Sequence, residues 1–186
     1  NALVKLPAGS TLEQTRAVAE RLTPFGMRRI AVKRTADPGQ AARLGMDWVG
    51  TMDALPRLLE EADIVFLCLP VTAETRSMID RPALDRIGAG GVLINASRGG
   101  LVDEAALTEA LAEGRIAGAG LDVFATEPLD PVSPLLRLPT VVATPHIAGV
   151  TDVSYAGIAS AFAGNVRRLM TGEALRNCVN AHDLRS

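Results

Sequence analysis

Residues 91–114 read GVLINASRGGLVDEAALTEALAEG, and this stretch decides the fold class. It opens with an apolar run that ends at Asn95, which is typical of a buried strand. Asp103 can then cap a helix that Gly114 ends. The inward face of this helix is formed by apolar residues at helical spacing: Ala106, Leu107, Ala110 and Leu111. A strand, a loop and a helix in this order form the repeating unit of a parallel α/β sheet.

The same alternation extends along the rest of the chain. Strands are expected at residues 29–33, 63–69, 117–121 and 140–143, most of them apolar on both faces. Asp53 is expected to cap a helix that turns Leu55, Leu58, Leu59 and Ala62 inward. A long helix is expected to open near Thr151 and Asp152, carry the stripe Ile158, Phe162, Val166 and Leu169, and end at Gly172. Residues 128–139, with four prolines, predict an ordered loop. The sequence therefore predicts a doubly wound parallel sheet, a Rossmann-like nucleotide-binding domain.

Composition excludes several classes of protein. With 186 residues, 48% of them hydrophobic, the chain can bury a sizeable core. Its longest apolar run, residues 64–69, stops far short of the ~20 residues of a membrane span, so no membrane association is expected. A net charge of -2 argues against nucleic acid as a partner. Cys68 and Cys178 have no metal-ligand spacing, so no metal is expected, and a buried Cys68 thiol fits a reducing cytoplasm.

The first thirty residues depart from this pattern. A doubly wound nucleotide domain should open with a strand, then G-x-G-x-x-G, then a helix. A helix is expected from Arg16, which places the three glycine positions at Ser10, Leu12 and Thr15. A leucine at the middle position would keep a pyrophosphate away from the backbone.

Residues 3–7 also predict a poor central strand, because Pro7 cannot donate to a ladder. Either the binding loop has degenerated, or a strand-and-loop segment near residues 13–15 is absent from this chain, and we favour absence. We expect a lead-in segment at residues 1–14, and the interpretation that we favour places a break in the natural sequence between this segment and the domain that follows. That dinucleotide-binding domain spans residues 15–172, and a tail spans residues 173–186.

Three motifs each follow a predicted strand, where ligands bind in an open α/β sheet. They span residues 95–103, 120–128 and 144–149. In the first, Arg98 precedes two glycines and could hold a carboxylate with two parallel hydrogen bonds, although most arginines are simply solvated. In the third, His146 is mounted on a turn that suits a general acid/base, although a buried or capping histidine is usually the better interpretation of a single histidine. Glu127 is the carboxylate of these motifs that could orient His146, although taken alone it would be an exposed glutamate.

Together, the three motifs closely resemble those of the D-isomer-specific 2-hydroxyacid dehydrogenases, a family that includes phosphoglycerate, glyoxylate and hydroxypyruvate reductases. The resemblance covers about residues 16–180. It implies that Arg98 holds the carboxylate and carbonyl oxygen of a 2-keto or 2-hydroxy acid. It also implies that His146, paired with Glu127, exchanges the hydroxyl proton while hydride moves to or from NAD(P).

The resemblance also implies which residues line the cofactor. Asp122 would contact the nicotinamide carboxamide. The other implied cofactor contacts are Leu69, Pro70, Thr75, Ala96, Ser97, Ala148 and Gly149. After the second expected strand come Lys33, Arg34 and Thr35, where an NAD enzyme usually carries an acidic residue. Two cations and a hydroxyl suit a 2′-phosphate, so we favour NADP over NAD; the alternative is a basic strand end that faces only water.

In this family the substrate lies between the nucleotide domain and a separate substrate domain, which is largely absent from this chain. The chain is therefore expected to be the cofactor half of an oxidoreductase, and the family implies a homodimer. The competing hypothesis is a non-catalytic nucleotide-sensing or scaffold protein of the same fold. The spaced set Arg98, Glu127 and His146 favours the enzyme. The identity of the 2-hydroxy acid stays open, because its pocket would come largely from the other domain.

Overall fold

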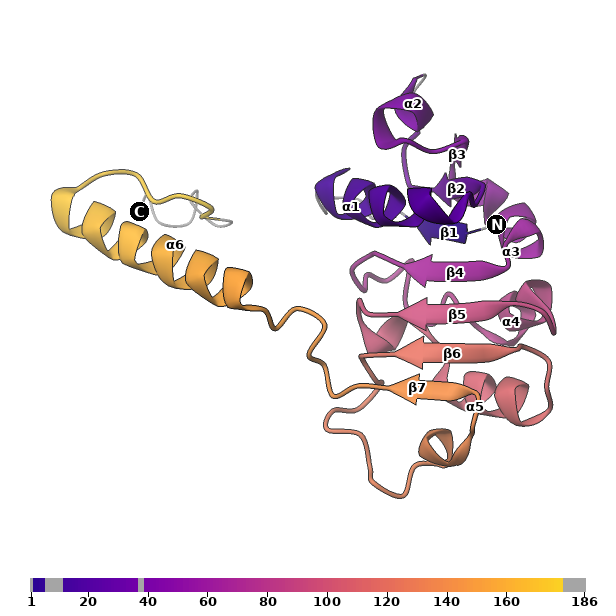
Figure 1. The fold of residues 1–186 in the computed structure, drawn as a ribbon. Helices are drawn as coiled ribbons and strands as arrows, with labels where there is room; N and C mark the ends of the chain where they lie inside the picture. Colours follow the sequence, from indigo (N-terminus) through magenta and orange to yellow (C-terminus); the bar gives the residue numbers. More distant parts are fainter. Residues whose placement is uncertain (1, 6–11, 37–38, 179–186) are drawn as a thin grey trace. The chain divides into compact units, whose positions relative to one another are not determined.

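The computed structural model describes residues 2–5, 12–36 and 39–178. Within them, seven strands form one parallel sheet (Figure 1). The strands are β1 (Ala2–Lys5), β2 (Arg29–Val32), β3 (Trp48–Gly50), β4 (Ile64–Leu67), β5 (Val92–Asn95), β6 (Gly118–Leu121) and β7 (Val141–Ala143). Their order is β3-β2-β1-β4-β5-β6-β7, so the chain winds outward from β1 in both directions. This topology confirms the predicted doubly wound α/β class.

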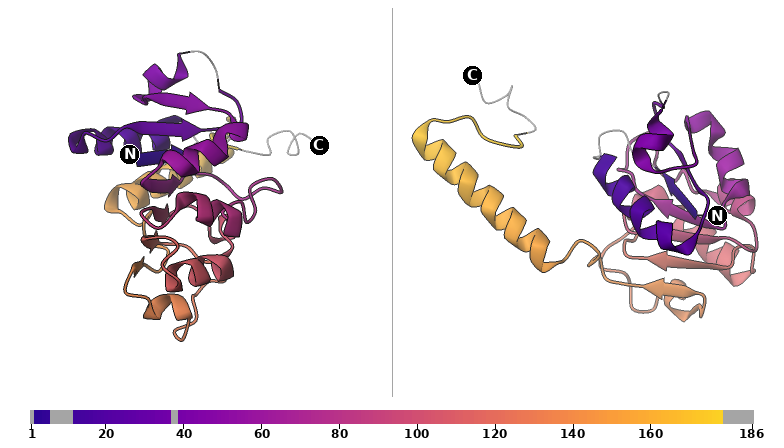
Figure 2. Two further views of the ribbon diagram at one scale, coloured as in Figure 1. Left: turned by 90° about the vertical axis from the view of Figure 1, so that its right-hand side faces the viewer. Right: turned by 45° about the horizontal axis from the view of Figure 1, so that its top comes forward.

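Helices α1 to α5 cover the two faces of the sheet (Figure 2). The helices are α1 (Leu12–Leu22), α2 (Gln40–Leu44), α3 (Leu55–Glu61), α4 (Arg81–Ile87), α5 (Glu104–Ala112) and α6 (Asp152–Thr171), with short 3₁₀ turns η1 (Thr23–Phe25), η2 (Met52–Ala54), η3 (Gly99–Leu101) and η4 (Pro134–Arg137). Helices α3, α4 and α5 pack side by side, and α1 packs with α2. Along β2, Ile30 and Val32 join the core beneath α3, whereas Ala31 joins a second core with Ala19 of α1. The alternation shows that this strand is buried on both faces.

Most of the predicted helix ends are confirmed. Asp103 caps α5 by accepting a hydrogen bond from the Ala106 amide at 3.0 Å, and Gly114 follows with a φ of 68°. Helix α6 begins at a reciprocal capping box between Thr151 and Ser154 and ends at a left-handed Gly172. The proline-rich segment is ordered around η4, as predicted.

The predicted cap at Asp53 is wrong. The turn η2 comes first and moves the start of α3 to Leu55, so Ala54 becomes the N-cap without a side-chain bond. Asp53 instead accepts a hydrogen bond from the Thr51 hydroxyl. The predicted inward face of this helix is nevertheless correct, because Leu58 and Leu59 are buried.

The N-terminal prediction is also wrong in part. Strand β1 pairs with both β2 and β4, so it is central in the sheet. The objection from Pro7 does not apply, because the strand ends two residues earlier, and the first strand is therefore present. Helix α1 starts at Leu12, so Leu12 and Thr15 lie in a helix. Ser10 and the rest of the β1–α1 loop lie outside the described residues.

The chain forms two compact units, Asn1–His146 with the sheet and Ile147–Ser186 with α6. The domain boundaries expected from the sequence stay a prediction. None of the helices in the described ranges is long and apolar enough to cross a bilayer.

The strand register positions the three motifs. Asn95 at the end of β5 is paired with Leu67 on one side and Leu121 on the other, and Leu121 is paired with Ala143. The carboxyl ends of four neighbouring strands are thus level. The segments that directly follow these strand ends, as far as His146 after β7, must therefore begin at one edge of the sheet.

Candidate active site

The loop that presents Arg98 is shaped by a buried amide. Asn95 donates from Nδ2 to the Arg98 carbonyl at 3.0 Å and accepts from the Ser97 amide at 3.1 Å. Arg98 itself has an extended backbone. Its Nη1 donates to the Ser97 carbonyl at 2.6 Å, and this bond uses one of the several N–H donors of the guanidinium.

Ser97 joins this loop to the segment that follows β4. Its hydroxyl donates to the Leu69 carbonyl at 2.6 Å and accepts from the Leu69 amide at 3.1 Å. Thr75 donates to the Pro70 carbonyl at 2.8 Å. Four of the residues predicted to line the cofactor, Leu69, Pro70, Thr75 and Ser97, therefore lie along one hydrogen-bonded segment, and Ala96 is exposed beside it.

The first and second motifs touch backbone to backbone at Gly99. A Cβ atom at this position would lie 1.8 Å from the Phe124 carbonyl oxygen, so no side chain fits there. A second link is Glu104 at the start of α5, whose Oε2 accepts a hydrogen bond from the Ala125 amide at 2.9 Å. Neither contact was predicted from the sequence. The Arg98 loop and the loop that carries Glu127 are thus held in direct backbone contact. We call the contact between Gly99 and Phe124 the interlock at Gly99.

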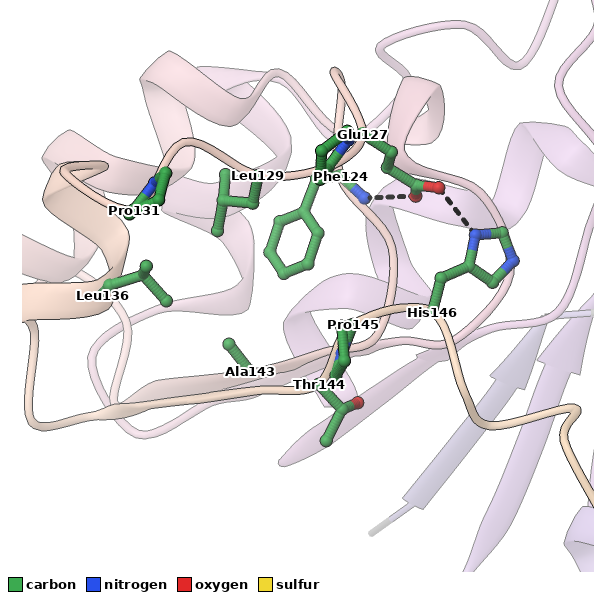
Figure 3. Close-up of a pocket in the computed structure, with 10 residues that line it drawn as sticks. Phe124, Glu127, Leu129, Pro131, Leu136, Ala143, Thr144, Pro145 and His146 are labelled. Carbon is green, nitrogen blue, oxygen red and sulfur yellow. Dashed lines mark hydrogen bonds and ion pairs between the residues drawn. The ribbon is translucent and has the colours of Figure 1, made fainter.

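Glu127 and His146 form a hydrogen-bonded pair (Figure 3). The distance between His146 Nδ1 and Glu127 Oε2 is 2.7 Å, and the other carboxylate oxygen accepts from the Phe124 amide at 3.0 Å. His146 has a φ of 55°, a left-handed conformation that costs free energy outside glycine. The turn after β7 therefore holds this histidine in an unusual backbone conformation, with its ring directed at the carboxylate.

The interactions around Glu127 indicate which group of the pair carries the proton of the hydrogen bond between them. The hydrogen bond from His146, the Phe124 amide and the charge of Arg98 hold the pKa of Glu127 below its usual value. An ionised carboxylate only accepts hydrogen bonds, so the proton between the two groups belongs to Nδ1 of His146. Nε2 is then the nitrogen that can exchange a proton with a bound molecule.

Asp122 and Thr144 form a second pair in the same part of the site. Asp122 is buried, with 5% of its surface exposed, and its Oδ1 accepts a hydrogen bond from the Thr144 hydroxyl at 2.5 Å. The Thr144 amide donates to the Leu121 carbonyl, which places Thr144 beside the end of β6. The sequence predicted a role for Asp122 but not for Thr144.

The predicted 2′-phosphate contacts follow β2. The amide of Lys33 donates to the Gly50 carbonyl at 3.0 Å; its side chain is half-buried, and Arg34 and Thr35 are exposed. A hydrogen bond from Thr72, its own backbone amide and the charge of Arg34 lower the pKa of Glu74.

The remaining predicted contacts, Ala148 and Gly149, belong to the second unit, where the Gly149 carbonyl accepts a hydrogen bond from the Ser154 hydroxyl at 2.7 Å.

In the first unit, an apolar cavity of about 410 Å³ lies beside the Glu127–His146 pair. Phe124 points into it toward Leu136 and Ala143 (Figure 3). No cluster of three potential metal ligands occurs among residues 2–5, 12–36 and 39–178.

Comparison with known proteins identifies the family of this chain. The family model described as D-isomer specific 2-hydroxyacid dehydrogenase, NAD binding domain, matches residues 13–148, most of the chain. The chain belongs to the D-isomer specific 2-hydroxyacid dehydrogenase family. The matched range begins within α1 and ends just after His146, so it contains Arg98, Glu127 and His146.

Individual 2-hydroxyacid dehydrogenases show the same likeness. The chain is 50% identical over 126 residues to a glyoxylate/hydroxypyruvate reductase B from Serratia proteamaculans (strain 568), covering 68% of this chain and 39% of that protein. It is 41% identical over 163 residues to a D-3-phosphoglycerate dehydrogenase from Mycobacterium tuberculosis (strain ATCC 25618 / H37Rv), covering 88% of this chain and 30% of that protein.

Among solved structures, the chain resembles an NADPH-dependent glyoxylate/hydroxypyruvate reductase from Sinorhizobium meliloti in complex with NADP and malonate, with a TM-score of 0.81. The two are 32% identical, and the match covers 97% of this chain and 53% of that one. The chain therefore spans well under two thirds of these three relatives and corresponds to an NAD(P)-binding domain.

Proposed function

We propose that the enzyme containing this chain interconverts a D-2-hydroxy acid and a 2-keto acid by hydride transfer with NAD(P). The observation that carries this proposal is the 2.7 Å pair of His146 and Glu127, beside a loop that carries Arg98 and packs at Gly99 against the loop of Glu127. An acid/base group and a cation at one sheet edge match the two needs of this reaction. These are a proton at one oxygen of the substrate and a partner for its carboxylate.

His146 is the general acid/base of the proposed reaction. In the oxidising direction, neutral Nε2 accepts the proton of the substrate hydroxyl, and in the reducing direction the protonated ring returns it to the carbonyl oxygen. Glu127 holds Nδ1–H throughout, so one tautomer faces the substrate. Because Glu127 stays ionised, it also stabilises the charged imidazolium that forms when Nε2 takes the proton.

Arg98 is proposed to bind the substrate carboxylate and to polarise the carbonyl oxygen. The guanidinium is planar and can form two parallel hydrogen bonds to a carboxylate, which fixes the plane of the substrate as well as its position. The interlock at Gly99 holds the Arg98 loop in place relative to the Glu127 loop. Such fixed orientation is a main source of rate enhancement when two groups must act on adjacent atoms.

The residues at the sheet edge fit a nicotinamide dinucleotide. A buried acceptor at Asp122 suits the amide of a carboxamide, and the strand order reverses at β1, where nucleotides bind in this fold. When bound, the cofactor supplies the hydride acceptor or donor, and Asp122, Ala96 and Ser97 are the residues proposed to hold its nicotinamide end.

We further propose that NADP(H) is preferred to NAD(H). Lys33, Arg34 and Thr35 follow β2 without a carboxylate among them, and two cations with a hydroxyl match a 2′-phosphate. The expected signature is selective. Arg34→Ala should weaken NADPH binding about 10-fold, as the loss of one charge-assisted hydrogen bond predicts, and leave NADH within about 2-fold. Equal losses for both cofactors, measured by nucleotide fluorescence, would show that Arg34 makes no contact with the 2′-phosphate.

The decisive test of the proposed function uses the two histidines of the sequence. His146→Gln should lower kcat for glyoxylate, hydroxypyruvate or phosphohydroxypyruvate by about 10²- to 10⁴-fold, the usual contribution of a general acid/base. It should leave the Kd for the cofactor largely unchanged. His182→Gln is the matched control. Cofactor binding without turnover of any 2-keto acid in the parent protein would support the nucleotide-sensing or scaffold alternative instead.

The family resemblance also leads us to propose a homodimer as the working state. Sedimentation equilibrium measures this directly, and a mass that stays monomeric at micromolar concentration would contradict it.

A further inference from the structure

The contact between Glu104 and Ala125 joins two parts of the chain that act together in the proposed reaction. Glu104 is the first residue of α5, directly after the N-cap Asp103, and its Oε2 lies 2.9 Å from the Ala125 amide nitrogen. The neighbouring amide, that of Phe124, donates to Glu127 at 3.0 Å. Two successive backbone amides are therefore each bound by a carboxylate from a different place in the sequence.

We propose that Glu104 is a positioning residue that holds the loop of Glu127 in the orientation that pairs it with His146. This inference rests on the proposed function, because it assigns Glu104 to the same acid/base machinery. Glu104 acts through the Ala125 peptide, which lies two residues before Glu127.

The geometry explains why this one bond matters. The loop from Phe124 to Glu127 leaves the buried end of β6, but Ala125 and Thr126 are exposed, so burial does not hold them. The close contact at Gly99 lies against the Phe124–Ala125 peptide, and Glu104 accepts the hydrogen bond from the N–H of this same peptide. Without Glu104, this N–H loses its acceptor and the contact at Gly99 alone holds the peptide. The exposed residues that lead from it to Glu127 can then shift the carboxylate away from His146.

The chemistry of Glu104 suits this role. A carboxylate accepts a hydrogen bond from an amide more strongly than a neutral oxygen does. Its place in the first turn of α5 puts the negative charge near the positive end of a helix dipole. A neutral glutamine at the same position keeps an acceptor oxygen but loses this charge, and alanine loses both.

The experiment compares Glu104→Ala and Glu104→Gln with Glu109→Gln in the full chain. Glu109 is the matched control, because it lies on the same helix in an exposed ion pair with Arg81. Long-range ¹H–¹⁵N spectra report which ring nitrogen of His146 carries the proton, and amide exchange reports the protection of Ala125. Glu104→Ala should lower the Nδ1–H tautomer of His146 and accelerate Ala125 exchange about 10-fold or more, as the loss of a charge-assisted hydrogen bond predicts. Glu104→Gln should fall between this variant and the parent, and Glu109→Gln should match the parent.

Kinetics provide the second readout. Glu104→Ala should reduce kcat/KM for the 2-keto acid about 10- to 100-fold, the size expected when a catalytic group is displaced by about 1 Å, with the cofactor Kd unchanged. Glutamine should restore part of this loss. A parent-like His146 tautomer in Glu104→Ala, or a loss of thermal stability alone, would overturn the proposal. If the parent turns over no 2-keto acid, the proposed function fails, while the tautomer and exchange measurements still decide whether Glu104 holds the pair. If Glu104→Ala does not fold, Glu104→Gln gives the same comparison.

Discussion

Gly99→Ala is the substitution for which the structure predicts the clearest effect. The added Cβ would lie 1.8 Å from the carbonyl oxygen and 1.9 Å from the carbonyl carbon of Phe124, and both are backbone atoms. Real Cβ atoms essentially never approach closer than 3.0 Å, so the two loops must separate by about 1 Å. A side chain could rotate away from such a contact, but a backbone cannot.

The expected cost has two parts. Forcing apart a close-packed contact typically costs about 1–3 kcal/mol of folding free energy. In a protein of this length, about 2 kcal/mol lowers Tm by roughly 4–8 °C. The second part is catalytic: a shift of about 1 Å between Arg98 and the Glu127–His146 pair should lower kcat/KM about 100-fold in the enzyme containing this chain.

The neighbouring glycine supplies the control. At Gly100 a Cβ would meet only side-chain atoms, at 3.4 Å or more, so Gly100→Ala should leave both Tm and kcat/KM close to those of the parent. Thermal unfolding followed by circular dichroism measures the first quantity, and steady-state kinetics the second. If Gly99→Ala is as stable and as active as Gly100→Ala, the two loops are not interlocked and the reasoning fails.

Three further predictions concern other parts of the molecule. The pKa of Glu127 is lowered in the folded state, so its charge stabilises the fold only where the carboxyl is ionised. The stability advantage of the parent over Glu127→Gln should therefore be complete above about pH 4.5 and fade as the pH falls below it. Urea unfolding from about pH 3 to 7 measures this difference. Burial raises the pKa of the Cys68 thiol to about 11, so little of it is thiolate at about pH 8. In a Cys178→Ser background, Cys68 of the folded protein should therefore react with a thiol reagent at this pH far more slowly than Cys68 of the protein unfolded in guanidinium. Asp103→Ala removes the bond to the Ala106 amide and should cost about 1 kcal/mol in urea unfolding, whereas a cost near zero would mean that the cap adds nothing.

The strands that could be predicted are those with a strong local signal. Apolar runs bounded by Pro, Gly or Asp identified β4, β5 and β6 to within one or two residues. Strand β3 was missed because three residues at the edge of the sheet carry too short a pattern. Strand β1 was rejected because Pro7 was counted inside it, and a boundary error of two residues was enough to reverse the interpretation.

The residues of the candidate site also fall into those that the sequence predicts and those that it does not. Arg98, Glu127 and His146 lie in motifs that could be found along the sequence, and the structure brings Glu127 and His146 into contact. The contacts of Gly99 and Glu104 could not be found, because their partners are backbone atoms of residues more than 20 positions away. Backbone partners leave no trace in the identity of the partner residue, so a single sequence carries no signal for them.

The interlock at Gly99 has a consequence for the timing of the proposed reaction. Two loops joined through their backbones cannot rearrange separately, so the loops of Arg98 and Glu127 take up their relative position as the sheet folds, and the proposed reaction would use them in that position. The reorganisation that an aqueous reaction undergoes at each event is thereby moved into folding, where it occurs once. A preorganised edge of this kind leaves the substrate and the cofactor as the parts that must still be brought into register.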